Sequence, residues 1–66
     1  MMNLRFHVAK IRAEKGLSGR KLAELAKVGL RSIERLEAEK VNPRIETLCR
    51  IAKALDVSVC DLFSYD

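Results

Sequence analysis

The chain has 66 residues, of which 48% are hydrophobic and 33% charged, and its formal net charge is +4. A domain this small buries only about 60% of the surface of its unfolded chain, which leaves little room for a deep catalytic cleft. No apolar run approaches the roughly 20 residues of a membrane span, and the first residues lack the pattern of a signal peptide, so we expect a compact, cytoplasmic protein without a membrane partner.

A first helix is predicted over residues 4–15. Hydrophobic residues recur with a period near 3.6 throughout the chain, and no stretch alternates as a half-buried strand does, which favours an all-α fold. Leu4, Val8 and Ile11 share one helical face after Asn3, a good N-cap. Gly16 suits the left-handed end of this helix.

Two short helices follow the first. Ser18 caps a helix of about two turns with an inward face of Leu22, Ala23 and Ala26. Gly29 caps the next helix, over residues 30–38. The joint of two or three residues between them makes these helices cross at a large angle.

The third helix has an apolar face and a polar face. Ile33 and Leu36 are expected to point inward. Four polar residues are expected to point outward: Arg31, Ser32, Glu34 and Arg35.

A fourth helix is predicted over residues 43–55, because Asn42 is a good cap and Pro43 suits a first helical position. Its apolar stripe is expected to lie in the core and consists of Ile45, Leu48, Ile51, Ala52 and Leu55. The segment from Ser58 to Asp61 has the pattern of a capping box and opens a short fifth helix that carries Leu62 and Phe63.

Positive charge is concentrated in the first half of the chain. Residues 1–33 carry eight lysines and arginines against two glutamates, whereas residues 34–66 carry five against seven acids. Such asymmetry suits a face that binds a polyanion. On charge alone, a solvated helix surface explains it equally well.

The residues that could support catalysis or bind a metal are few and scattered. Cys49 and Cys60 form no Cys-x-x-Cys motif, and His7 has no cysteine, histidine or carboxylate companions. We expect the cysteines to be reduced and all three residues to be surface or packing residues. The chain is therefore expected to be neither an enzyme nor a metal-binding or cofactor-binding protein.

The chain resembles the lambda-repressor-like, or Cro/CI (XRE), helix-turn-helix domains over nearly its whole length. The residues that carry the resemblance, in order, are Leu17-Ser18, Leu22-Ala23, Val28, Ser32-Ile33, Arg35-Leu36-Glu37, Lys40, Asn42-Pro43, Thr47-Leu48, Ile51-Ala52-Lys53-Ala54-Leu55, Val57-Ser58 and Leu62-Phe63. The resemblance implies one domain, residues 1–66, of five helices, with the helix-turn-helix at about residues 18–38. The recognition helix, the third, would enter the major groove of DNA.

The resemblance also implies which residues contact DNA. Base edges would be read by Leu30, Arg31, Ser32 and Arg35, with Arg31 best suited to bond guanine. The DNA backbone would be contacted by Arg20, Lys21, Gly29, Lys40 and Arg44. Glu34 could accept a hydrogen bond from cytosine, or pair with Arg31 or a neighbouring lysine.

Two other sets of residues have structural roles in similar domains. Glu37 would tie the end of the third helix to Arg12. Val59, Phe63 and Tyr65 are candidates for a dimer interface, although they could equally close the core of the monomer.

Four residues depart from the common pattern of this family. Gly19 stands where a glutamine usually begins the second helix and contacts DNA. Lys27, Glu39 and Asp56 replace glycines, and a left-handed conformation costs a residue with a side chain about 1 to 2 kcal/mol. The turn at Lys27 is therefore either strained or built differently.

The favoured hypothesis is a sequence-specific transcriptional regulator, a repressor that binds an inverted repeat in double-stranded DNA as a homodimer. The alternative is a protein-interaction module, such as an antitoxin or an anti-regulator, with a weakened DNA face. An exposed apolar patch left over by the homodimer would favour that alternative.

Overall fold

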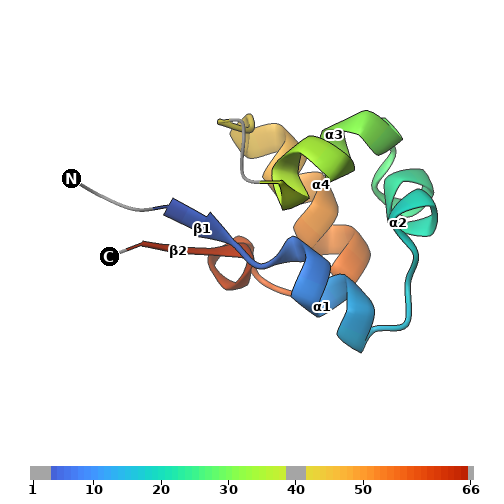
Figure 1. The fold of residues 1–66 in the computed structure, drawn as a ribbon, viewed down its shortest axis with the longest axis horizontal. Coiled ribbons are helices and arrows are strands. Elements are labelled where there is room, and N and C mark those ends of the chain that lie inside the picture. Colours follow the sequence, from blue (N-terminus) through green and yellow to red (C-terminus); the bar gives the residue numbers. More distant parts are fainter. Residues whose placement is uncertain (1–3, 39–41, 66) are drawn as a thin grey trace.

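The computed structural model describes residues 4–38 and 42–65, and within these ranges four α-helices surround one core (Figure 1). The helices are α1 (Val8–Glu14), α2 (Gly19–Ala26), α3 (Leu30–Glu37) and α4 (Ile45–Leu55). A single 3-10 turn, η1 (Val59–Leu62), follows α4. Two short strands, β1 (Leu4–Phe6) and β2 (Phe63–Tyr65), complete the fold. No helix in the described ranges is long and apolar enough to cross a membrane.

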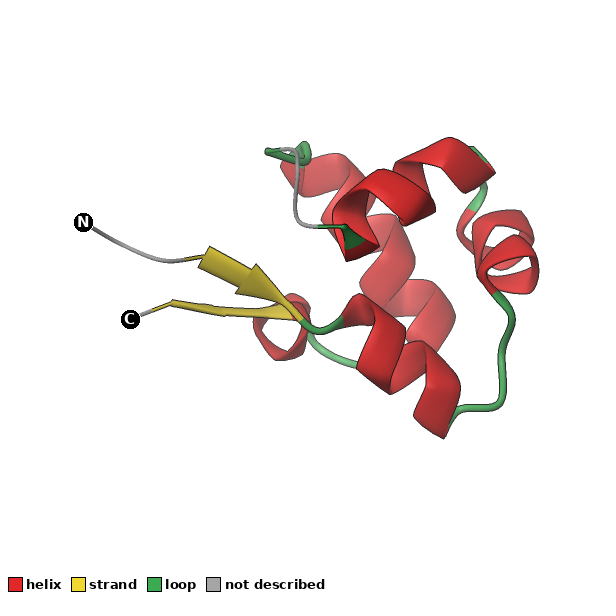
Figure 2. Ribbon diagram, viewed as in Figure 1, coloured by secondary structure: helices red, strands yellow, loops and turns green. Residues whose placement is uncertain are grey.

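The two strands pair antiparallel, so the first and last described residues lie side by side (Figure 2). Leu4 is opposite Tyr65, and Phe6 is opposite Phe63. His7 continues the connection: its N–H donates to the Leu62 carbonyl at 2.7 Å, and its Nε2 is hydrogen-bonded to Ser64 Oγ at 2.8 Å.

The prediction of a first helix over residues 4–15 is therefore wrong at its start. Leu4–Phe6 is extended, the helix begins at Val8, and Leu4 is 38% exposed instead of lying in the core. The proposed cap, Asn3, lies outside the described residues. Pairing with a strand from the far end of the chain outweighs the local helical pattern.

The predicted fifth helix is also wrong, although its capping box is present. Ser58 N–H donates to Asp61 Oδ2 at 3.0 Å, and Ser58 Oγ accepts from Cys60 N–H at 3.2 Å. The helical turn that follows is a four-residue 3-10 helix, and Phe63 already has extended dihedral angles. The fold is thus mostly helical, with a strand pair in place of five helices.

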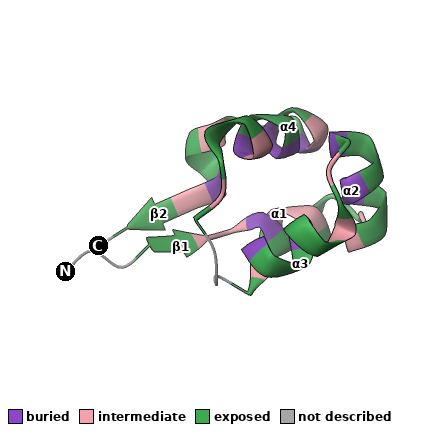
Figure 3. Ribbon diagram, turned by 90° about the horizontal axis from the view of Figure 1, so that it is seen from above, coloured by how far each residue is buried: buried purple, intermediate pink, exposed green. Residues whose placement is uncertain are grey.

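The core is built from residues on the facing sides of the helices, as Figure 3 shows. The buried residues are Val8, Leu22, Ala23, Ala26, Ile33, Leu36, Leu48, Ile51, Ala52, Leu55 and Leu62. Most of the predicted inward residues are among them. Ile45 is an exception at 68% exposure, because α4 begins only at Ile45 and Arg44, not Asn42, is its N-cap.

Candidate nucleic-acid interface

The helices α2 and α3 are joined by Lys27, Val28 and Gly29, as the sequence predicted. Ser18 caps α2, its Oγ accepting from Lys21 N–H at 3.0 Å. Lys27 ends α2 in the left-handed conformation, with φ 58° and ψ 43°, and Val28 N–H donates back to the Ala23 carbonyl at 3.0 Å. Lys27 therefore has the left-handed conformation that a glycine adopts easily, and this conformation is strained for a residue with a side chain.

An arginine of α4 supports this turn from outside. Arg50 Nη1 donates to the Lys27 carbonyl at 3.2 Å, and Arg50 Nη2 donates to Glu46 Oε1 at 2.7 Å. Arg50 was not predicted to have this role, since a single basic residue on the polar face of a helix gives no signal of such a contact. Arg50 thus links α4 to the connection that orients α3.

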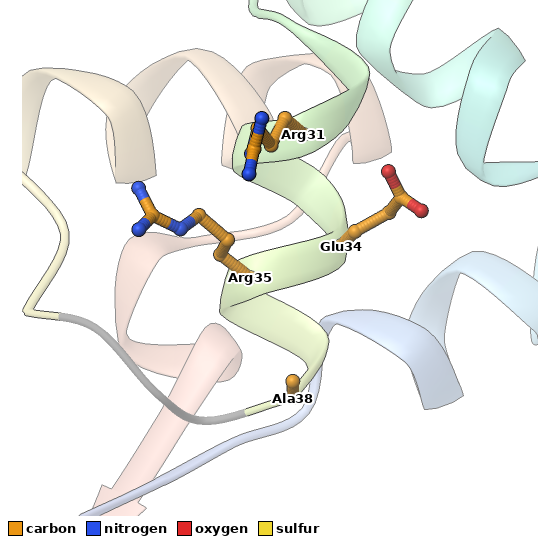
Figure 4. A pocket seen from close by; sticks show the side chains of 4 residues that line it. All are labelled: Arg31, Glu34, Arg35 and Ala38. Carbon is orange, nitrogen blue, oxygen red and sulfur yellow. The ribbon is translucent and has the colours of Figure 1, made fainter.

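The outer face of α3 is polar and solvent-exposed. Arg31, Ser32, Glu34 and Arg35 are all exposed, whereas Ile33 and Leu36 are buried. A shallow hollow on this face is lined by Arg31, Glu34, Arg35 and Ala38 (Figure 4). Arg35 extends from one side of α3 and Glu34 from the opposite side, with Arg31 one turn before Arg35. This face can therefore present two guanidinium groups to an anionic ligand.

A second hollow continues this surface toward α4. Arg35 belongs to both hollows, and the second also contains Ser32, Leu36, Asn42, Pro43, Arg44 and Thr47. Arg44 is exposed at the start of α4, as a phosphate contact requires. Asn42 and Thr47 were not predicted as site residues, although both belong to the stretches that resemble the family. The structure thus brings Ser32, Arg35 and Arg44 together.

The remaining candidate residues lie at different places. Arg20 and Lys21 are exposed at the start of α2, and neither lines these two hollows. Gly29 is exposed at the N-terminus of α3, whereas Leu30 is half-buried against the core. Lys40 lies outside the described residues.

Glu34 is exposed on the outer face of α3. None of the three ion pairs found within residues 4–38 and 42–65 includes it, so the predicted pairing with Arg31 is not formed there. In the same ranges Lys21 pairs with Glu24 at 3.9 Å, an exposed contact of little energetic weight.

The predicted tie between Arg12 and Glu37 is confirmed. The two side chains form a half-buried ion pair that connects α1 to the last residue of α3. This contact fixes the end of α3 that is opposite the turn at Lys27.

The three candidate dimer residues lie around the strand pair. Val59 and Phe63 are half-buried, and Tyr65 is 66% exposed. Phe63 also lines an apolar hollow with Leu4, Phe6, Asn42, Pro43, Ile45 and Leu48. Apolar surface is therefore exposed near β2.

The chain is similar to known proteins in both sequence and fold. The model of the helix-turn-helix family matches residues 8–62. The HTH-type transcriptional regulator PuuR of Escherichia coli (strain K12) is 37% identical over 57 residues, which are 86% of this chain and 31% of PuuR. The chain thus spans about a third of the length of this relative.

Two solved structures have closely similar folds. The N-terminal DNA binding domain of SinR from Bacillus subtilis is 36% identical, with a TM-score of 0.78 over 82% of this chain and 80% of that domain. The restriction-modification controller protein C.AhdI from Aeromonas hydrophila is 25% identical, with a TM-score of 0.80 over 83% of each chain.

Proposed function

The chain belongs to the helix-turn-helix family, and from that premise we propose that it is a sequence-specific regulator of transcription that binds double-stranded DNA. It acts as a repressor and binds an inverted-repeat operator as a homodimer, with one α3 in each of two successive major grooves. The observation that carries the proposal is the exposed polar face of α3, where Arg31, Ser32 and Arg35 stand on a helix held by a helix-turn-helix turn.

The side chains on α3 suit direct reading of bases. The major groove is about 12 Å wide and admits a helix with its side chains. An arginine can donate to both O6 and N7 of guanine, and each such pair discriminates by about 1 to 3 kcal/mol. Arg31 and Arg35 are exposed and belong to none of the ion pairs among the described residues, so neither must break one of those pairs to reach a base.

The surrounding residues suit contacts with the DNA backbone. Arg44 flanks α3 in the hollow that contains Arg35, and Arg20 and Lys21 are exposed at the first turn of α2. Contacts of this kind set the position of a protein on DNA and make its affinity depend on salt. Gly29 adds the N-terminus of α3, where backbone N–H groups favour an anion.

A selection from randomised duplexes at roughly 150 mM salt tests the proposal, with the mass of the protein in solution measured alongside. We expect an enriched inverted repeat, bound by a dimer. Arg31→Ala should weaken binding by roughly 5- to 150-fold for each half-site and relax the preference at one base pair in each half-site. Arg44→Ala should instead weaken all duplexes alike and lower the salt slope by about two, one for each subunit of the dimer.

Lys10→Ala is the control, since Lys10 is an exposed cation on α1, outside the proposed surface. Its affinity should match that of the wild type. Weak binding that disappears with salt and enriches no sequence would refute sequence-specific regulation. An enriched site bound by a monomer would refute the homodimer alone.

A further inference from the structure

Another hollow, separate from those described above, lies between the C-terminal ends of α2 and α4 and is lined by positively charged residues. We call it the α2–α4 groove, and its lining residues are Leu25, Ala26, Lys27, Arg50, Lys53 and Ala54. Leu25 is 49% exposed, although α2 has a complete buried face without it. The residues that line the groove are therefore three apolar residues and three cations, with no acidic residue among them.

The cations of the groove are largely unneutralised. Arg50 pairs with Glu46, whereas Lys27 and Lys53 belong to none of the ion pairs within residues 4–38 and 42–65. An anionic ligand would relieve the repulsion among these like charges and would be attracted before contact.

The groove is distinct from the surface on α3. It shares no lining residue with either hollow that contains Arg35. The leucine and alanines that line it suit contact with an apolar side chain, and a phosphodiester backbone has no apolar side chain to insert. The chemistry therefore favours a polypeptide over a nucleic acid.

We propose that the α2–α4 groove binds an acidic polypeptide segment that places one apolar side chain against Leu25 and its carboxylates near Lys27, Arg50 and Lys53. Interfaces commonly combine an apolar contact with polar pairs around it, and the residues that line the groove are of both kinds. Binding in this groove leaves the α3 face open, so it goes beyond the proposed DNA binding and does not depend on it.

Selection of 12-residue peptides from a random displayed library against the wild-type protein tests this proposal. We expect enrichment of peptides with several aspartates or glutamates around one large apolar residue. An enriched peptide, synthesised with a fluorophore, should bind about tenfold more weakly to Leu25→Ser, which loses an apolar contact. Lys53→Glu, which reverses one charge of the groove, should weaken binding of the peptide by a similar factor.

Two controls separate binding from folding. Lys10→Glu makes the same charge change on α1 and should bind the peptide within about twofold of the wild type. Lys53 lies in the last turn of α4, where a cation stabilises the helix, so the melting temperature of each variant is measured as well.

Failure of this proposal can be told apart from failure of the proposed DNA binding. Enrichment of peptides without acidic residues, or binding that Leu25→Ser and Lys53→Glu leave unchanged, would overturn the proposal. It would also be overturned if these variants weakened binding of the selected duplex as strongly as Arg31→Ala does. Failure to find any operator, in contrast, would leave the peptide result intact.

Discussion

Arg12 and Glu37 join α1 to the end of α3 through two parallel hydrogen bonds. Arg12 Nε donates to Glu37 Oε2 at 2.8 Å, and Nη2 donates to Oε1 at 3.0 Å. The remaining Nη1 donates to the Leu17 carbonyl at 3.0 Å, so one guanidinium holds α1, α3 and the segment before α2. The hydrogen bonds with Glu37 raise the pKa of Arg12 above its ordinary value, which by itself already keeps an arginine charged over the practical pH range.

The first prediction concerns the strength of this pair. Glu37→Gln should lower the free energy of unfolding by about 1 to 3 kcal/mol, because the two side chains are only 22% and 19% exposed. Glu24→Gln is the matched control, since it breaks the exposed pair with Lys21, and it should cost less than about 1 kcal/mol. Denaturant unfolding of both variants measures the difference. Equal losses would show that the half-buried pair stabilises the fold no more than the exposed pair does.

The second prediction concerns the left-handed residue between α2 and α3. Lys27→Gly should raise the free energy of unfolding by about 0.5 to 1 kcal/mol, because glycine adopts φ 58° without steric cost. Lys27→Ala removes the same side chain but keeps the strain, and should not stabilise the protein. Thermal unfolding of the two variants isolates the backbone effect, and equal melting temperatures would contradict it.

The third prediction concerns Gly19 at the start of α2. A Cβ atom there would lie 3.7 Å from Leu30 Cδ1 and 3.9 Å from Ile33 Cγ2, which is ordinary contact, so a side chain fits. Similar domains carry a glutamine at this position that contacts DNA. Gly19→Gln should therefore tighten binding to the selected operator by about fivefold for each half-site, about the value of one added hydrogen bond per subunit.

Gly19→Ala separates this contact from a general effect on the helix. It shares the gain in helix propensity but lacks the amide, so its affinity should stay near that of the wild type. Fluorescence anisotropy with the operator duplex measures all three proteins. If glutamine and alanine act alike, the missing DNA contact is not restored at this position.

The fourth prediction concerns the proposed dimer. Tyr65→Ser should raise the dissociation constant of the dimer by at least about tenfold without lowering the stability of the monomer, because Tyr65 is 66% exposed. Leu25→Ser is the control, since it removes an exposed side chain from the α2–α4 groove, away from β2. Sedimentation equilibrium over a range of concentrations gives the dissociation constant of the dimer for both variants. An unchanged mass distribution for Tyr65→Ser would place the interface elsewhere.

Local signals in the sequence predicted much of the fold correctly. The caps Ser18 and Gly29 and the buried faces of α2 and α3 depend on neighbouring residues, which the sequence displays directly. The strand pair depends on contacts between the two ends of the chain. Three residues are too few to show the alternation of a strand, and Leu4 also fits a helical period with Val8.

The residue types of the candidate site were predictable from the sequence, but the contacts that hold the site in place were not. The exposed positions of α3 follow from its helical period. The approach of Arg44 to Arg35 depends on where α4 lies relative to α3, and the bond from Arg50 to the Lys27 carbonyl depends on the packing of α4. No pattern within one segment specifies either contact.

The pairing of Leu4 with Tyr65 closes the chain into a loop that contains every helix. Closing so long a loop costs more conformational entropy than closing the short loops of the local contacts in this fold. Each strand contributes only three paired residues to offset that cost. The strand pair should therefore form last during folding and open first in the native protein, with fast amide hydrogen exchange. If two copies associate through Phe63 and Tyr65, exchange at β2 should slow as protein concentration rises, which couples the order of the chain ends to the amount of protein present.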